Sequence, residues 1–491
     1  MMKGASPTVR GSAALVLSCS LLLVGGCRSV GPNYTPPNTT TPTNWSASAT
    51  AGVTTSPASP ETLSYWWAQL NDPILSDLME RARAGNLDVR QAEARLRAAR
   101  AQRGVSKAAL FPNVAATASA SRNRGSGQSG ATDNLFANGF DASWEMDVFG
   151  KKRRVLESAD ATMQASQEAV SDALVSLFAE VALNYVEVRS DQLLIALTET
   201  SLATRAETCD ITRWRHEAGL TTQLDVDQAQ LSLEQARADL PTLRTSLEKG
   251  QHRLAVLMGQ PPGRLKELLA DPKAIPAPPL DIAVGVPADV LRRRPDIRQA
   301  ERKLAAQTAQ IGVAQAARYP DFSLLGSIGI ESLSLGTLYN AGARTAQAAA
   351  NATWTLFDGG SLRQAVQVQT ALQEEALSLY EATVLTALED VENALLAYAN
   401  EQARRRALQA AVQAGQSAFE LARDQYTSGL VDFQTVLDMQ RTLLSVQDQL
   451  IASDAEVTAN VIRLYKALGG GWNSRSPAPA ATQTNNSGGT S

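Results

Sequence analysis

Few side chains in this sequence have the chemistry of a catalytic or metal-binding site. The 491 residues include two histidines and three cysteines. His216 and His252 lie far apart, without a cysteine or glutamate at metal-ligand spacing, so we interpret both as surface residues. Cys19 and Cys27 lie near the N-terminus, which leaves Cys209 as the only thiol in the body of the chain. The sequence therefore predicts no metal site and no internal disulfide.

One glycine-rich segment matches a dinucleotide-binding pattern. Residues 125–130 read Gly-Ser-Gly-Gln-Ser-Gly, which satisfies GxGxxG. That motif cradles a pyrophosphate where it opens a helix, but residues 131–136 lead into an alternating segment, so a loop between strands is the better interpretation. The motifs HExxH, GxxxxGK and GxSxG are absent from the sequence. We predict no cofactor and no enzyme activity.

Charge and composition narrow the class of protein further. Lys and Arg number 45 against 49 Asp and Glu, a formal charge of -4 that argues against a charge-driven nucleic-acid partner. Aromatic residues make up 5% of a chain that is 44% hydrophobic. Such an aliphatic and alanine-rich composition suits long, closely packed helices.

The N-terminus has the pattern of a bacterial export signal. Lys3 and Arg10 precede an apolar run, residues 13–24, that is too short to span a bilayer. The run ends Leu-Val-Gly-Gly before Cys27, which resembles a lipobox and predicts a lipidated cysteine. An ordinary signal peptide with an incidental cysteine is the alternative. Arg28 follows where lipoprotein sorting by resemblance would read aspartate for inner-membrane retention, so we expect the outer membrane.

The body of the chain is an internal duplication. Residues 86–112 align without a gap to residues 294–320, and 14 of the 27 pairs are identical. With a shift of 210 residues, Trp144 matches Trp354 and Gly150 matches Gly360. A period this long exceeds that of solenoid repeats, so we expect two substantial units related by a pseudo-twofold axis.

Each copy contains two segments that alternate between apolar and polar side chains. In the first copy, Phe140 and Trp144 point one way while Asp141, Glu145 and Asp147 point the other. Strands of about ten residues with one apolar and one polar face are typical of transmembrane β-strands. A half-buried soluble hairpin uses the same alternation and is the alternative. The acidic face suits a wet lumen, so we favour membrane strands.

A long helical pattern follows each hairpin. Residues 152–218 contain no proline and would extend roughly 100 Å as one helix. Gly219 and Gly429 interrupt the pattern, where a left-handed glycine can end one helix and start its antiparallel partner. The predicted organisation is a signal peptide 1–26, a lipidated N-terminal strap or linker 27–60, a first repeat 61–262 with hairpin 113–148 and helices 152–258, an inter-repeat linker 263–287, a second repeat 288–472 with hairpin 321–357 and helices 361–468, and a disordered tail 473–491.

Four membrane strands cannot close a barrel, because an open edge in lipid leaves backbone groups unpaired. Two chains would give eight strands with a filled interior, whereas three would give twelve and a water-filled bore. The polar inward faces favour a homotrimer.

With these features the sequence resembles the TolC/OprM-type outer-membrane efflux channels, in particular the lipoprotein (NodT-like) branch that serves RND transporters. The resemblance covers nearly the whole mature chain. Its marks are Val30-Gly31-Pro32-Asn33-Tyr34, Pro36-Pro37, Trp66-Trp67, Asp72-Pro73, Leu291-Arg292-Arg293-Arg294-Pro295-Asp296-Ile297 and Leu464-Tyr465-Lys466-Ala467-Leu468-Gly469-Gly470-Gly471-Trp472. It implies a mixed, mostly α fold: a trimeric barrel of twelve β-strands, a periplasmic α-barrel of long antiparallel helices, and a mixed equatorial region.

The same resemblance implies two kinds of site. The helical tips look like segments that dock a periplasmic adaptor; they comprise Ala218, Gly219, Leu220, Ser428, Gly429 and Leu430. A turn that serves only the fold is the alternative.

Asp438 and Arg441 match an acidic ring and its tethering base at the periplasmic mouth, and as i and i+3 they share a helix face. Gln434 stands where some relatives have an apolar constriction, and Asp225 and Asp227 could add acidity. A solvated helix face is the alternative.

We therefore predict a passive outer-membrane duct for multidrug or other small-molecule efflux. It would be anchored in outer-membrane lipid on the periplasmic side, with its helices in the periplasm. Its partners would be a periplasmic adaptor (membrane fusion) protein and an inner-membrane RND transporter, because nothing in the chain supplies energy. A periplasmic adaptor and a pore-free coiled-coil scaffold remain alternatives at this point. Trp66 and Trp67 could suggest sugar stacking, but packing on helices is the simpler account.

Overall fold

The computed structural model describes residues 29–38, 42–46, 53–54, 56, 59–124, 132–279 and 282–472. The predicted signal peptide, the tail and the 125–130 loop lie outside these residues. The elements follow in order as β1 (Val53–Thr54), α2 (Pro60–Ser64), η1 (Trp66–Leu70), α3 (Pro73–Gly85), α4 (Leu87–Ala108), β2 (Asn113–Arg124), β3 (Thr132–Met146), α5 (Lys151–Glu217), α6 (Gln223–Leu257), β4 (Ile282–Ala283), α7 (Pro287–Arg293), α8 (Pro295–Ala316), β5 (Asp321–Ser332), η2 (Leu335–Thr337), η3 (Ala341–Ala343), β6 (Arg344–Thr353), α9 (Ser361–Thr427) and α10 (Phe433–Ala467).

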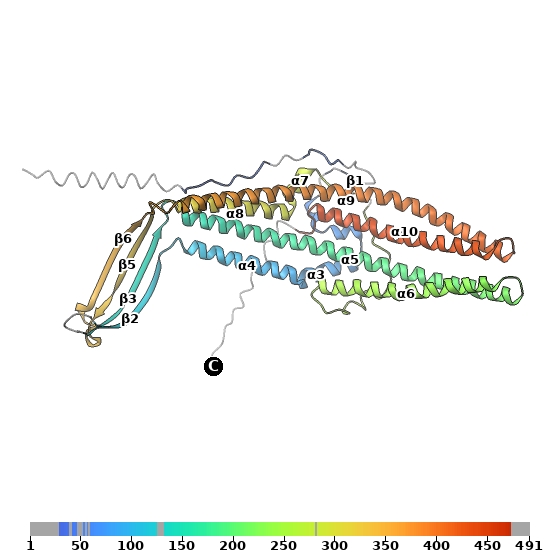
Figure 1. Cartoon of the computed structure of the whole chain (residues 1–491), viewed down its shortest axis with the longest axis horizontal. Helices are drawn as coiled ribbons and strands as arrows, with labels where there is room; N and C mark the ends of the chain where they lie inside the picture. The colour runs from blue at the N-terminus through green and yellow to red at the C-terminus, as the bar shows by residue number, and fades with distance from the viewer. Residues whose placement is uncertain are drawn as a thin grey trace, which may run out of the picture. The chain divides into compact units, whose positions relative to one another are not determined.

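The helices confirm the duplication. Helices α4 and α8 each have 22 residues, α5 and α9 each have 67, and α6 and α10 each have 35. In each copy a long helix and a shorter partner are joined by a tight turn (Figure 1). The sequence pattern of both copies therefore yields the same supersecondary block.

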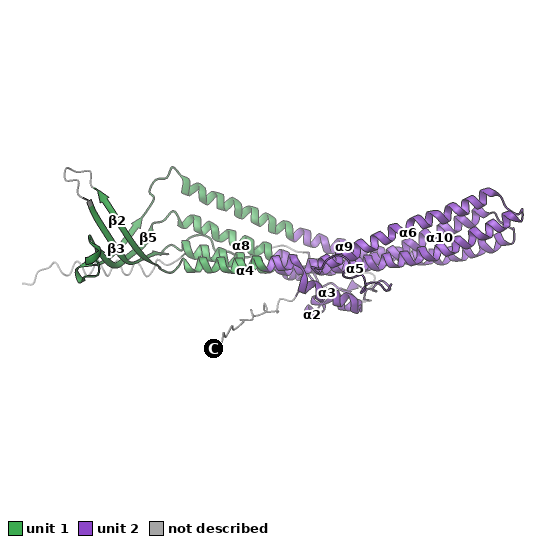
Figure 2. Ribbon diagram, turned by 90° about the horizontal axis from the view of Figure 1, so that it is seen from below, with its two compact units in different colours: residues 1–39, 94–168, 298–383 green, residues 40–93, 169–297, 384–491 purple. Residues whose placement is uncertain are grey.

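The compact units of the chain do not coincide with the two repeats. Unit 1 comprises residues 1–39, 94–168 and 298–383, and unit 2 comprises residues 40–93, 169–297 and 384–491 (Figure 2). Each unit thus takes its segments from both copies. Unit 1 holds the sheet, and unit 2 holds the two helical tips.

The sheet of unit 1 has the order β2-β3-β5-β6, with every neighbouring pair antiparallel (Figure 1). The four predicted strands are present, although β6 ends at Thr353 and leaves Trp354 just beyond it. Strands β2 and β6 are the two edges, and neither pairs with a further strand among the described residues.

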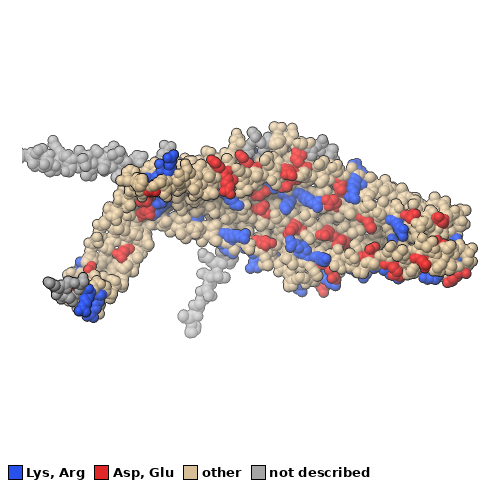
Figure 3. All heavy atoms as spheres, in the orientation of Figure 1, with Lys and Arg blue, Asp and Glu red and all other residues tan. Residues whose placement is uncertain are grey.

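Register separates an apolar face of the sheet from a polar one. Ala116, Phe140, Ile328 and Ala346 lie directly opposite one another across the four strands, and opposite residues share a face. The neighbouring row, on the other face, is Ala115, Asp141, Ser327 and Gln347. Phe140 and Ile328 are exposed although they are large and apolar. Figure 3 shows few charged side chains over the strands and many over the helices.

Two equivalent tryptophans connect the sheet to the helices that precede it. The indole N–H of Trp144 donates to the carbonyl of Leu110 at 3.0 Å, and that of Trp354 donates to Arg318 at 3.1 Å. Leu110 and Arg318 are themselves equivalent positions of the two repeats, each two residues before the proline that precedes a strand. The duplication therefore extends to single hydrogen bonds.

One sequence expectation for the sheet is wrong. Asp147 was expected on the polar lumenal face, but its carboxylate accepts the backbone N–H groups of Lys152 and Arg153 at 3.0 and 2.9 Å. It therefore caps the N-terminus of α5, where four backbone N–H groups lack helical partners. Asp358 has the same role at α9, where it accepts from Gly360 and Leu362.

The main core of unit 2 packs around the first tryptophan pair. Trp66 and Trp67 are buried, Trp66 stacks on Tyr465 with ring centroids 5.5 Å apart, and Trp67 contacts Phe178 at 4.6 Å. This confirms the packing role expected for the pair. Helix α5 is long and apolar enough to cross a bilayer by length and composition, but it places Tyr185 in this core.

The segments expected to be an extended strap or linker (27–60) and an inter-repeat linker (263–287) also form short structure in unit 2. Strand β1, from the 27–60 segment, pairs in parallel with β4 of the 263–287 segment. The indole of Trp45 donates to the carbonyl of Gly285 at 2.9 Å. Composition alone did not reveal these contacts, since they depend on partners more than 200 residues away in the chain.

Candidate docking tips and channel mouth

The turn between α5 and α6 is a helix end closed by a left-handed glycine. Gly219 has a φ of +73°, and its N–H donates to the carbonyl of His216 at 2.8 Å. The N–H of Leu220 donates to Arg215 at 2.8 Å. These bonds satisfy carbonyls that the helix leaves free. As a result Ala218 and Leu220 are exposed, with Leu220 67% accessible.

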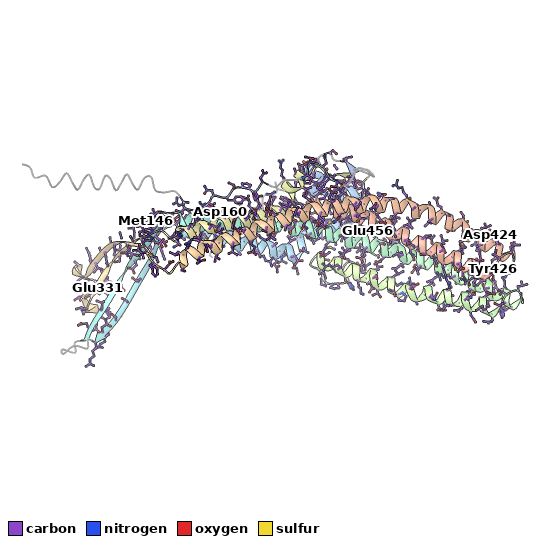
Figure 4. All side chains as sticks on the ribbon, turned by 45° about the horizontal axis from the view of Figure 1, so that its top comes forward. Met146, Asp160, Glu331, Asp424, Tyr426 and Glu456 are labelled. Carbon is purple, nitrogen blue, oxygen red and sulfur yellow. The ribbon has the colours of Figure 1, made fainter. Side chains whose placement is uncertain are left out.

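The turn between α9 and α10 repeats this geometry. Gly429 has a φ of +75°, its N–H donates to Tyr426 at 2.9 Å, and the N–H of Leu430 donates to Gln425 at 2.9 Å. Ser428 is exposed and Leu430 is 75% accessible. Both tips therefore present one apolar side chain directly after a glycine. The tip end of α9 is marked in Figure 4 by Asp424 and Tyr426.

Acidic residues cap the helices that leave the two tips. Thr222 and Asp225 form a capping box at α6, and Asp432 caps α10 through the N–H of Thr435 at 2.9 Å. Burial alone would raise the pKa of Asp225, but hydrogen bonds from Thr221 and Thr222 lower it below its usual value. Asp225 was predicted to add acidity to the mouth. Its Oδ2 accepts the hydrogen bonds of the cap.

The predicted mouth residues Gln434 and Asp438 lie one turn apart on α10 and are joined to each other. The amide of Gln434 donates to the carboxylate of Asp438 at 2.9 Å, and on α6 Gln223 donates to Asp227 at 2.9 Å. The expected ion pair of Asp438 with Arg441 does not form within the described part of the chain. The amide of Gln434, at i−4, donates to Oδ1 of Asp438. Asp438 is exposed, as is Arg441.

A polar cluster that the sequence did not reveal lies deeper in the tip bundle. Arg205 of α5 donates to the carbonyl and hydroxyl of Ser232 on α6 at 2.7 and 2.6 Å. Burial lowers the pKa of Arg205 and the charge of Arg441 acts in the same direction. Burial, and then the charge of Asp239, raise the pKa of Asp448. Helical periodicity could not show this cluster, because its members come from three helices.

The two hairpins contact each other near their tips in unit 2. The guanidinium of Arg215 lies 4.6 Å from the ring centroid of Tyr426 and donates to the carbonyl of Thr427 at 3.2 Å. Cys209 is buried in the apolar cluster between the hairpins, together with Phe419 and Leu437. The thiol of Cys209 donates to the side-chain oxygen of Gln230 at 3.5 Å and accepts from the guanidinium of Arg213 at 3.8 Å. Arg215 ties one helical hairpin to the other.

No group of three His, Cys, Asp or Glu side chains within the described ranges could hold a metal ion. Cys27, the predicted lipidation site, lies outside those ranges. The features available for function are therefore an amphipathic open sheet, two exposed tips and an acidic, polar helix pair beside them. Together they define a channel-forming protein of the TolC-like type.

The chain belongs to the outer membrane efflux protein family, whose model matches residues 78–260 and 286–470. The toluene efflux pump outer membrane protein TtgC of Pseudomonas putida is 33% identical over 93% of this chain and 95% of that protein. Nodulation protein T of Rhizobium leguminosarum is 34% identical over 92% and 96%. This membership decides against the periplasmic adaptor that the sequence left open.

Solved structures agree with the fold. The outer-membrane channel OprN matches with a TM-score of 0.86 and 36% identity, over 90% of this chain and 99% of that one. The open state of the MtrE outer membrane channel of Neisseria gonorrhoeae matches with a TM-score of 0.79 and 29% identity, over 90% and 98%. The protein is therefore an outer-membrane efflux channel with the TolC-like fold predicted from the sequence.

Proposed function

We propose that this chain forms a passive homotrimeric duct and is the outer-membrane component of a tripartite efflux system. The observation that carries the proposal is the sheet of unit 1, which has one apolar face, one polar face and two unpaired edges. A sheet of this kind is stable in lipid only when its edges are paired.

Three copies satisfy this requirement best. Each chain contributes four strands, so pairing β2 of one copy with β6 of the next gives twelve strands from three chains. The apolar row containing Phe140 and Ile328 would then face lipid. The polar row containing Asp141 and Ser327 would line a bore wide enough for water.

We place the duct in the outer membrane with a lipid anchor on Cys27. The apolar run before Cys27 and the Arg28 that follows it support this assignment. The long helices would extend into the periplasm, since the helices that precede and follow each hairpin all join the sheet at the same end of its strands.

We infer that the two tips dock a periplasmic adaptor and that the adaptor connects the duct to an inner-membrane RND transporter. Exposed Leu220 and Leu430 support docking, because a large apolar side chain at the end of a helical hairpin stabilises no core. The polar stretch of α10 would line the periplasmic mouth, and two carboxylates of α6 would add acidity to it. The residues are Gln434, Asp438 and Arg441 on α10, with Asp225 and Asp227 on α6. With the Asp438 carboxylate joined to Gln434, we expect its pairing with Arg441 to occur between copies.

The solute would be a small molecule selected by the pump. A duct with a polar lining and no enclosed apolar pocket can pass many solutes, whereas selectivity requires a shaped site. Energy would come from the transporter, since an open duct needs no chemical step of its own.

The test is single-channel conductance of the purified protein in a planar bilayer. We expect discrete steps that share one unit conductance. A pore-free scaffold would give none, even after substitutions at Asp438 and Arg441 that widen the mouth.

A further inference from the structure

The charged residues of the four-stranded sheet are divided between its two faces by sign. The faces follow from the register, because opposite residues of neighbouring strands share a face. The carboxylates of the strands all lie on the polar face; they are Asp133, Asp141, Glu145, Asp321 and Glu331. The arginines of the strands all lie on the apolar face; they are Arg122, Arg124 and Arg344. Within the described strands, the apolar face therefore carries only positive charge.

The three arginines also share one end of the sheet. Arg122 and Arg124 lie at the end of β2, and Arg344 begins β6, so all three are at the end away from the helices. Figure 3 shows basic side chains gathered at this end of the strands. Each of the three is exposed, and none forms an ion pair with another residue that the structure describes. Their charge is therefore available to a partner.

The face that carries the arginines is the outer face of the proposed barrel. The opposite face lines a hollow of about 370 Å³, and its lining includes Asp141, Ser327 and Gln347. A sheet that closes into a barrel has its hollow face inside. The arginines then point toward the surrounding lipid, on the same face as Phe140 and Ile328.

The level of the arginines corresponds to the lipid head groups. Trp354 lies just beyond the inner end of β6, and Arg344 begins that strand ten residues earlier. Ten residues of strand extend about 33 Å, and a tilt of roughly 40° reduces this to a height of about 25 Å. The apolar band of outer-membrane barrels has about this height. With Trp354 at the inner interface, Arg344 therefore reaches the outer one, where a charge on the lipid face costs little.

A tyrosine of the loop between β5 and β6 lies at the same level. The amide of Asn138 donates to the hydroxyl of Tyr339 at 3.4 Å, and Asn138 is in one row with Ile330 and Arg344 across the sheet. Tyr339 is 77% exposed, and the loop also exposes Leu333. Exposed aromatic side chains at the ends of strands are typical of the boundary between lipid and water.

The duplication predicts which arginines meet when copies associate. Strands β3 and β5 pair within the chain, and their counterparts in the other repeat are β6 and β2, at shifts of 210 and 208 residues. The pair of Phe136 and Ser332 within the chain therefore predicts a pair between copies, with Ala346 of one copy opposite Arg124 of the next. Arg344 lies two positions from Ala346 on the same face, so its Cα comes about 7–8 Å from that of Arg124. Within one chain these two arginines are on opposite edges of the sheet.

We propose that each interface between copies is a binding site for the phosphate groups of a phosphorylated glycolipid in the outer leaflet of the membrane. Arg122 and Arg124 of one copy and Arg344 of the next supply the guanidinium groups, whose paired N–H donors fit phosphate oxygens. The exposed Tyr339 and Leu333 lie beside them for contact with the acyl chains. A single chain holds only part of the site, so the inference rests on the proposed trimer and its place in the outer membrane.

Native mass spectrometry of the detergent-extracted protein with added lipid A tests the site. We expect a trimer that retains one phosphorylated lipid A molecule at each of its interfaces. The double variant Arg124→Gln/Arg344→Gln should bind lipid A about tenfold or more weakly, because charge-assisted hydrogen bonds to phosphate are lost. The matched control is Arg318→Gln, at an exposed position near the inner end of β5. This control should bind lipid A as tightly as the unmodified protein.

Three outcomes would overturn the site. One is equal retention of lipid A by the double variant and the unmodified protein. Another is equal retention, by the unmodified protein, of lipid A with and without its phosphates. This comparison needs no variant, so it decides alone if the double variant fails to accumulate. The third is displacement of lipid A by an equimolar amount of inorganic phosphate, which would identify a site for free anions.

The same spectra separate this inference from the proposed duct. A trimer whose retention of lipid A does not depend on phosphate removes the site and leaves the duct intact. A protein that is not a trimer contradicts the duct, and with it any site shared between copies.

Discussion

Arg294 differs from the two arginines before it in the extent of its burial. Of the three consecutive arginines before Pro295, Arg294 is buried, with its side chain 11% exposed. It bonds Asp296 at 2.7 Å, Asp390 at 3.0 Å and the carbonyl of Ala467 at 3.1 Å. Burial opposes its charge, but the two carboxylates raise its pKa above the usual value.

Replacing Arg294 with methionine should therefore destabilise the protein. The change leaves two carboxylates without their cation, and because both are partly exposed we expect a loss of about 2 kcal/mol in the free energy of unfolding. Urea unfolding followed by circular dichroism would measure it. Arg292→Met, at an exposed position of the same motif, should change stability little; equal effects would contradict the assigned role.

Asp191 gives a pH-dependent prediction at the same scale. Its Oδ2 is buried without a hydrogen-bond partner in the part of the chain that the structure describes. Burial, and then the charge of Glu187, raise its pKa from 3.8 to about 6. Between pH 3.8 and about pH 6, Asp191 keeps its proton in the folded state but has lost it in the unfolded state. The free energy of unfolding therefore falls as the pH rises toward 6.

Asp191→Asn removes this titration. We expect the variant to be more stable than the unmodified protein by about 1 kcal/mol at pH 7.5, allowing for solvent screening, and nearly equal to it at pH 4. Thermal unfolding at the two values measures the difference. An equal gain in stability at both pH values would contradict this account, because it would not depend on the titration of the Asp191 carboxylate.

At the scale of elements, the two tips should act in docking without contributing to the fold. Leu430→Asp places a charge on an exposed residue, so the helices should form as before. We expect adaptor binding to weaken about tenfold or more, as for an apolar contact residue of an interface, and drug tolerance to fall to the level of a deletion strain. The control is Gln413→Asp, at an exposed position of α9 away from the tip. This variant should retain full drug tolerance.

The elements were the most predictable part of the molecule. Periodicity and the two tip glycines placed α5 and α9 within a residue or so of their ends, because a long apolar period and a left-handed glycine are local signals. Alternation likewise located the strands. The Trp144 and Trp354 hydrogen bonds and the Arg205 cluster were missed, since each joins segments that only the tertiary fold brings together.

The mouth stays a prediction, and the hydrogen bonds of its residues could not be derived from spacing. Spacing placed Gln434, Asp438 and Arg441 on one helix face, but spacing cannot decide between neighbours at i−4 and i+3. The structure selects the amide of Gln434 as the partner of Asp438. Asp225 carries a local capping signal as well, and the structure shows the capping box that Thr222 and Asp225 form.

At the scale of the whole molecule, the proposed trimer accounts for two features that a single chain leaves unsatisfied. Its sheet has two open edges, and its apolar face exposes Phe140 and Ile328 to whatever surrounds it. In the proposed trimer, pairing β2 of one copy with β6 of the next would remove both edges at once and would give the bore its polar lining. Assembly and conduction would then depend on one interaction.

Native mass spectrometry of the detergent-extracted protein tests this claim most directly. The account predicts one dominant species of three chains that persists until heating separates it. A dominant single chain, or an assembly of any other number, would contradict it, because no closed barrel of twelve strands could then form.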